Sequence, residues 1–135
     1  MISVEVAREL SDAGLVWTPV NGDRFFIPDR DLDEEVFAIS DMTVDVRVVP
    51  GGKEISFNGA VEWALDAIEQ HEVVWLPTET QLRQALGEHF VSLWRTTDGF
   101  ACVASVRGEH RDFAAPDAAD AYAMALLDHL RAQLI

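Results

Sequence analysis

The sequence predicts an α+β fold in which antiparallel sheets and about four helices form two lobes that share a central helix. Three observations support this prediction. After Gly14 the spacing of hydrophobic residues changes from a helical period to alternation. Asn-Gly, Asp-Gly and Arg-Gly pairs then mark tight turns between short alternating segments. Hydrophobic residues make up 49% of the 135 residues, which is enough to bury a core in one domain of this length.

The N-terminal part is expected to contain one helix followed by strands. Over residues 3–13 the hydrophobic residues repeat at helical spacing, and Gly14 stands where a left-handed C-cap is favoured. Asn21-Gly22 tolerates the positive φ angles of a hairpin turn, which predicts paired strands at 15–19 and 24–28. Further strands are expected at 36–39, 43–49 and 54–57.

The central helix is expected over residues 59–70. At about 100° per residue, its polar side chains fall on one arc, which leaves hydrophobic residues around the rest of the circumference. A helix of this kind has to be covered on more than one side, so we expect both lobes to enclose it. The polar arc is more simply explained as its solvent-facing stripe than as a metal site, and consists of Glu62, Asp66, Glu69 and Gln70.

The C-terminal lobe is expected to contain a helix, a three-stranded meander and a final helix. Thr78 and Gln81 have the spacing of a capping box, and Gly87 ends that helix. No linker rich in proline, glycine or serine separates residues 1–72 from residues 77–135, so we expect two lobes within one domain, 1–135. The strands of the meander are expected at 90–95, 100–106 and 110–113, and the final helix after Pro116.

The charge of the chain restricts its partners. Acidic side chains outnumber basic ones by 24 to 10, and the formal net charge is −14. Because this charge repels phosphate groups, and because no two basic residues are adjacent, neither nucleic acid nor an anionic membrane surface is expected as a partner. A basic protein would be attracted over a long range, although a net charge of this size is explained more simply by the solubility it gives a domain. No apolar run reaches the roughly 18 residues of a membrane span, and the N-terminus lacks the features of a signal peptide, so a cytoplasmic location is expected.

The sequence lacks the motifs of common enzymes and metal sites. Lys53, the one lysine, is not part of a phosphate-binding glycine loop, and there is no G-x-S-x-G nucleophile turn. Cys102 lies in the middle of a predicted strand, where a small buried side chain is expected. No short spacing joins any two of the histidines, which are His71, His89, His110 and His129. We therefore expect no catalytic residue, no metal and no cofactor.

Two tryptophans and an acidic run are the candidate interaction residues. Hydrophobic pattern places Trp63 and Trp94 in the core but does not dictate burial of Trp17 or Trp75, and an exposed indole is a frequent interface anchor. The acidic run fails the calcium-loop pattern, because Glu34 stands where glycine is required. It is a solvated connection, an interaction edge or an adventitious site for a divalent ion, and its candidate interaction residues are Asp29, Asp31, Asp33 and Glu35.

Short motifs in the middle of the chain carry a resemblance to a known group of proteins. They are Ser40-Asp41-Met42, Phe57-Asn58-Gly59, Glu62-Trp63-Ala64-Leu65-Asp66, and Trp75-Leu76-Pro77 with Gln81-Leu82. Over most of its length the chain is similar to small uncharacterised proteins predicted in actinobacterial genomes, some of which carry an automatic label linking them to pilus assembly. That label implies a cytoplasmic ATPase-like assembly factor, but the chain lacks the nucleotide-binding loop that such a factor needs. The resemblance therefore supports the fold outline and transfers no site.

These observations favour a non-enzymatic, acidic protein-interaction or regulatory module that binds a protein partner of unknown identity, with a basic protein as the candidate that suits its charge. An inhibitor of a basic toxin or nuclease would be a special case of this function. The alternative is a small-ligand-binding protein, or an enzyme of unrecognised type, with a cleft between the two lobes. That cleft would lie near His71, Glu72 and Trp75.

Overall fold

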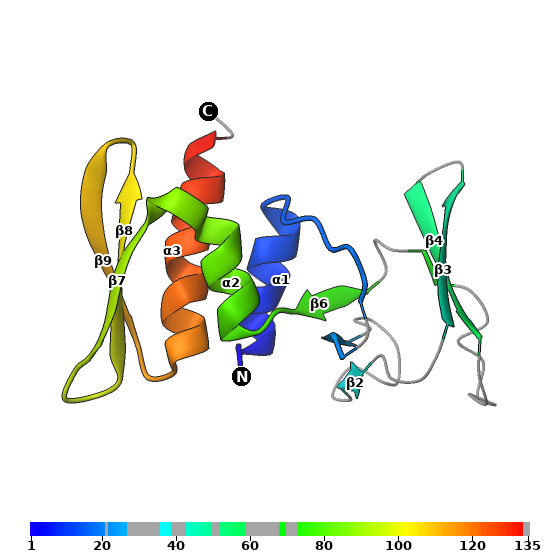
Figure 1. Cartoon of the computed structure of the whole chain (residues 1–135), viewed down its shortest axis with the longest axis horizontal. Helices are drawn as coiled ribbons and strands as arrows, with labels where there is room; N and C mark the ends of the chain where they lie inside the picture. Colours follow the sequence, from blue (N-terminus) through cyan, green and yellow to red (C-terminus); the bar gives the residue numbers. More distant parts are fainter. Residues whose placement is uncertain are drawn as a thin grey trace. The chain divides into compact units, whose positions relative to one another are not determined.

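The computed structural model describes residues 1–20, 22–26, 36–38, 43–49, 52–58, 68–69 and 73–133. The chain divides into two compact units, one formed by Met1–Val16 with Leu76–Ile135 and the other by Trp17–Trp75. The described residues form three α-helices and three sheets of three strands each, in which the strand pairs discussed below are antiparallel (Figure 1). The predicted α+β class is confirmed. The fourth helix and the arrangement around a central helix are not.

The two units differ from the two predicted lobes in the position of the first helix. Helix α1 (Val4–Asp12) packs on helix α3 (Ala118–Gln133), so the start of the chain belongs to the same unit as its C-terminal part. The buried stripe of α1 contains Ala7 and Leu10. An apolar stripe predicts that a helix is covered but does not identify the covering element, which explains the difference. The prediction of a single domain over residues 1–135 stays a prediction.

Hydrogen bonds hold the N-terminus of α1 in place. Ser3 is the N-cap, and its hydroxyl accepts a hydrogen bond from the Val6 N–H at 3.4 Å. The backbone N–H of Ser3 donates to Asp120 Oδ1 in α3 at 2.7 Å, which ties the two helices together. Beyond the C-terminus, Gly14 has a φ of 101°, a conformation that favours glycine. The predicted helix and its terminal glycine are confirmed.

Helix α2 (Glu79–Leu86) begins with the predicted capping box. The Thr78 hydroxyl accepts a hydrogen bond from the Gln81 N–H at 3.2 Å, and Gln81 Oε1 accepts one from the Thr78 N–H at 2.9 Å. A 3₁₀ turn, η2 (Gly87–His89), follows directly. The buried side chains of α2 are Leu82 and Leu86.

Thr78→Ala is expected to lower the free energy of unfolding by about 1 kcal/mol, because it removes the acceptor for the Gln81 N–H. Thr78→Ser keeps a hydroxyl in the same place and is expected to cost only a few tenths of that amount. Urea denaturation of both variants, followed by far-ultraviolet circular dichroism, measures the difference. Equal destabilisation by alanine and serine would contradict a capping role for the hydroxyl.

Strands β7 (Phe90–Arg95), β8 (Phe100–Val106) and β9 (Glu109–Ala115) form the predicted antiparallel meander, in the order β7-β8-β9. Helix α3 packs against β8 and β9 and covers one face of this sheet (Figure 1). Alternate residues of β8 are almost completely buried and mark the covered face. These residues are Cys102, Ala104 and Val106.

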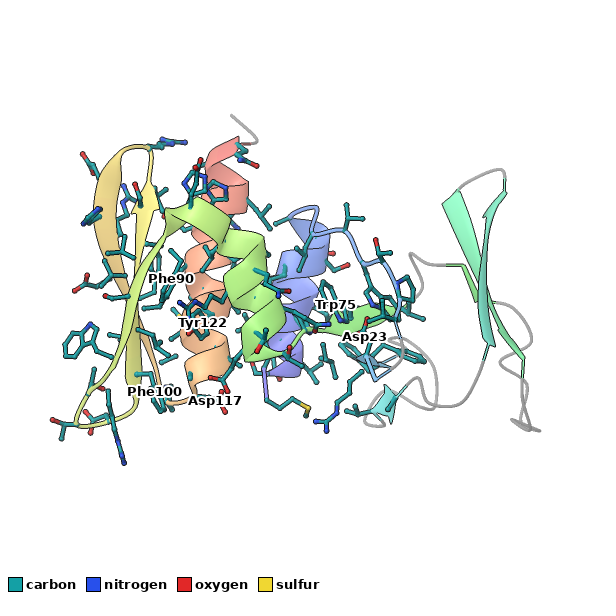
Figure 2. All side chains as sticks on the ribbon, in the orientation of Figure 1. Asp23, Trp75, Phe90, Phe100, Asp117 and Tyr122 are labelled. Carbon is teal, nitrogen blue, oxygen red and sulfur yellow. The ribbon has the colours of Figure 1, made fainter. Side chains whose placement is uncertain are left out.

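The core of this unit lies between the meander and the helices. The Phe90 ring lies 5.7 Å from the Tyr122 ring of α3 (Figure 2), and the Arg83 guanidinium of α2 lies 4.5 Å from the centre of the same Phe90 ring. The part of α3 toward its N-terminus is buried most completely. Its buried side chains are Ala118, Ala119, Ala121, Tyr122, Ala123, Ala125, Leu126 and Leu127.

The predicted hairpin between residues 15–19 and the following strand is wrong. Strand β1 (Arg24–Phe26) pairs with β2 (Phe37–Ala38) instead, and residues 15–19 form no strand. A tight turn is nevertheless present, because the Asp23 N–H donates to the Val20 carbonyl at 3.1 Å. The side chain of Asp23 also bonds to the segment before the turn, and these bonds replace a strand ladder there.

Strands β3 (Thr43–Val49) and β4 (Gly52–Asn58) correspond to the strands predicted at 43–49 and 54–57. They form an antiparallel pair, and β5 (Ile68–Glu69) pairs with the other side of β4. The central helix predicted over residues 59–70 is therefore wrong at residues 68–69, which form a strand. Pairing with a neighbouring strand outweighs helical periodicity here, since periodicity does not report on tertiary partners. Residues 59–67 and 70 of that prediction lie outside the described residues.

Candidate functional site

The face of the β7-β8-β9 meander that α3 does not cover is a candidate site. Side chains on this face follow from the strand register, because directly opposed residues point to the same side of a sheet. Trp94, Ala101 and Ala114 form one row across the three strands, and Ser92, Val103 and Asp112 form the next. We call these six residues the open face.

The open face presents a large aromatic side chain above small neighbours. Trp94 is 50% exposed, whereas Ala101 directly opposite it is only 3% exposed. An indole lying over an alanine accounts for both values, because a large side chain covers a small one across a strand pair. Val91, at the start of β7, is 42% exposed. Exposed tryptophan surface of this kind is typical of interface anchors.

The strands that carry the open face have balanced charge. Residues 90–115 contain three arginines and three carboxylates, although the whole chain has a net charge of −14. Most of the excess negative charge lies in residues 17–75, with 13 acidic and 4 basic side chains. Apolar contact on the open face is therefore not opposed by a local concentration of like charge.

The prediction that Trp94 lies in the core is wrong. Counting every second residue from the inward-facing Phe90 places Trp94 on the same side as Phe90. A register irregularity between Phe90 and Ser92 inserts one extra residue, so Leu93 rather than Trp94 is the residue of β7 opposite the buried Cys102. No feature of the sequence marks this bulge.

Trp17, a predicted interaction residue, is buried within the second unit. It is 5% exposed, and its indole Nε1 donates to Asp23 Oδ2 at 2.8 Å. Its ring lies 5.6 Å from Phe25 and is stacked at 6.4 Å on Trp75, with an angle of 10° between the planes. Trp17 therefore packs inside the unit and does not present its ring to solvent.

Trp75 lies in strand β6 (Val74–Leu76), which neighbours β1 in the sheet order β2-β1-β6. It is partly buried, and its Nε1 has no hydrogen-bond partner among the described residues (Figure 2). The cleft residues His71 and Glu72 lie outside the described residues, and the alternative function that uses them stays a prediction. The acidic candidates also lie outside them, namely Asp29, Asp31, Asp33 and Glu35.

Two histidines that are far apart in the sequence meet in the structure. The ring centroids of His89 in η2 and His129 in α3 are 4.2 Å apart, and the rings are tilted by 37°. Gln133, one helical turn after His129, has its amide nitrogen 3.1 Å from His129 Nε2. Burial, with a smaller contribution from His89, lowers the pKa of His129. Sequence spacing missed this pair because it recognises only ligands that are local in the chain.

Cys102 is completely buried, as predicted for a small core residue. Burial raises the pKa of its thiol to about 11, so the thiolate needed for nucleophilic attack is scarce at neutral pH. Within the described part of the chain, no group of three or more histidine, cysteine, aspartate or glutamate side chains is arranged to hold a metal ion.

Comparison with protein-family models, with curated proteins and with solved structures finds no match to this chain. The resemblance to a small actinobacterial family therefore stays a prediction. None of the helices in the described part of the chain has the length and apolar character that a membrane span requires.

Proposed function

We propose that this protein is a non-enzymatic interaction module that binds a basic partner protein through the open face. The observation that carries the proposal is Trp94, a half-exposed indole in one row with the small residues Ala101 and Ala114. Tryptophan is enriched among the residues that dominate binding energy at protein interfaces. A strand face that is covered on one side only provides a rigid support for such an anchor.

The charge distribution supports a basic partner. The net charge of −14 attracts a basic protein from a distance and raises its association rate. The balanced charge of residues 90–115 lets apolar surfaces approach at short range without accumulating like charges. The two features act at different distances, so they are compatible in one interface.

Trp94→Thr is the test of the proposed interface. Threonine keeps a high strand propensity and removes the indole, so the sheet is expected to form while binding is lost. The wild-type chain is used to capture partners from a lysate of the host organism, and each captured protein is then purified and titrated against both forms. We expect a basic partner whose Kd rises at least about tenfold in the variant, as for an interface hot spot.

The matched control is Met124→Gln, which changes another partly exposed hydrophobic residue of the same unit, on α3. Glutamine is a good helix former of similar size, and binding is expected to be unchanged. Affinity should also fall as salt screens the long-range attraction. Equal affinity of the wild type and Trp94→Thr would refute the open face as the interface. An acidic partner, or binding indifferent to salt, would refute the charge argument.

A further inference from the structure

The contact between His89 and His129 has the components of a small metal site. Their rings come from two elements, η2 and α3, and meet with centroids 4.2 Å apart. The Gln133 amide approaches His129 Nε2 at 3.1 Å. We propose that these three side chains bind a divalent transition-metal ion of the class that prefers imidazole, with Zn²⁺ as its representative.

The observed geometry is close to that of a liganded pair. Zn–N bonds of about 2.0–2.1 Å to two imidazoles at a tetrahedral angle place the ring centres about 5 Å apart. The centroids of His89 and His129, now 4.2 Å apart, have to separate by about 1 Å, and each ring has to turn one nitrogen toward the ion. A half-turn of the Gln133 amide presents its oxygen in place of its nitrogen, which supplies a third ligand. Water would complete the coordination, because both histidines are partly exposed.

The charge of the chain also favours cation binding. The net charge of −14 raises the local concentration of cations around the chain. The buried Cys102 thiol, with a pKa of about 11, does not compete as a ligand at neutral pH.

Titration of Zn²⁺ into the full chain by isothermal calorimetry tests this site. The wild-type protein is expected to bind one ion at this site, and both His89→Gln and His129→Gln are expected to raise its Kd at least tenfold. The two histidines belong to different elements, so misfolding of a single helix would not explain a loss of Zn²⁺ binding in both variants. Circular dichroism confirms that each variant is folded. His110→Gln and His71→Gln serve as controls and should leave the affinity unchanged.

A second titration distinguishes the histidine site from binding by surface carboxylates. Mg²⁺ prefers oxygen ligands and keeps its water, so a tenfold excess of Mg²⁺ should leave Zn²⁺ binding in place. Displacement of Zn²⁺ by that excess would assign the binding to carboxylates and overturn the proposal. Equal Zn²⁺ affinity in the wild type and in both histidine variants would overturn it as well, as would the absence of saturable binding to the wild type.

Discussion

Gly99→Ala is expected to lower the free energy of unfolding by about 3 kcal/mol or more. A Cβ atom on Gly99 would meet the backbone of the neighbouring strand. It would overlap the Ala115 carbonyl oxygen and lie 2.6 Å from the Pro116 Cα. Backbone atoms cannot move aside as the end of a long side chain can, so relief requires a shift of the sheet.

The position of Gly99 explains why such a shift is costly. The Thr96 N–H donates to the Gly99 carbonyl at 2.9 Å in the turn between β7 and β8, and the next residue, Phe100, pairs with Ala115 of β9. The same region leads into α3, where the Ala119 N–H donates to Asp117 at 2.8 Å (Figure 2). Displacing the turn therefore strains all three strands and the start of the helix.

Gly108→Ala is the matched control. Gly108 also lies in a turn of the meander and has a positive φ of 80°, but a Cβ there meets no atom within 4 Å. Its substitution is expected to cost about 1 kcal/mol, the usual penalty for an alanine in the left-handed region. Urea denaturation measures both values. If Gly99→Ala were no more destabilising than Gly108→Ala, the close approach of the two backbones would not exist.

The sequence predicts the first and last parts of the chain well because their signals are local. The Thr78–Gln81 capping box and the glycines of the turns determine backbone conformation through neighbouring residues alone. Strand ends in the meander agree with the prediction to within two residues, because Asp98-Gly99 and Arg107-Gly108 mark both turns. Features that depend only on short segments are therefore recoverable from sequence.

The candidate sites could not be predicted, because they depend on contacts between distant segments. One extra residue in β7 turns Trp94 from the covered face to the open face, and alternation alone does not reveal it. His89 and His129 come together only because η2 and α3 end in the same region. Similarly, Ile68 has a place in a helical pattern but pairs with Ile55 in a sheet. In each case the contact with a distant segment determines the conformation, and the local sequence does not.

Asp23 holds the turn that replaces the predicted hairpin, and this leads to a stability prediction. This carboxylate is 4% exposed and accepts hydrogen bonds from the Trp17 Nε1–H at 2.8 Å and from the Val20 N–H at 3.1 Å, both on Oδ2. Asp23→Ala is expected to lower the free energy of unfolding by about 3 kcal/mol, because it leaves two donors without their acceptor. Near-ultraviolet circular dichroism during urea denaturation reports on the packed indoles and measures the loss.

Two further variants separate the hydrogen bonds from the shape of the side chain. Asp23→Asn keeps an acceptor oxygen in the same position and is expected to cost only about 1 kcal/mol, since hydrogen bonds to a neutral amide are weaker than those to a carboxylate. Trp17→Phe removes the indole donor, so combining it with Asp23→Ala should cost less than the two single changes together, with a coupling of about 1.5–3 kcal/mol. Additive losses would mean that the Trp17–Asp23 hydrogen bond contributes nothing, and that Asp23 acts through its bond to the Val20 N–H.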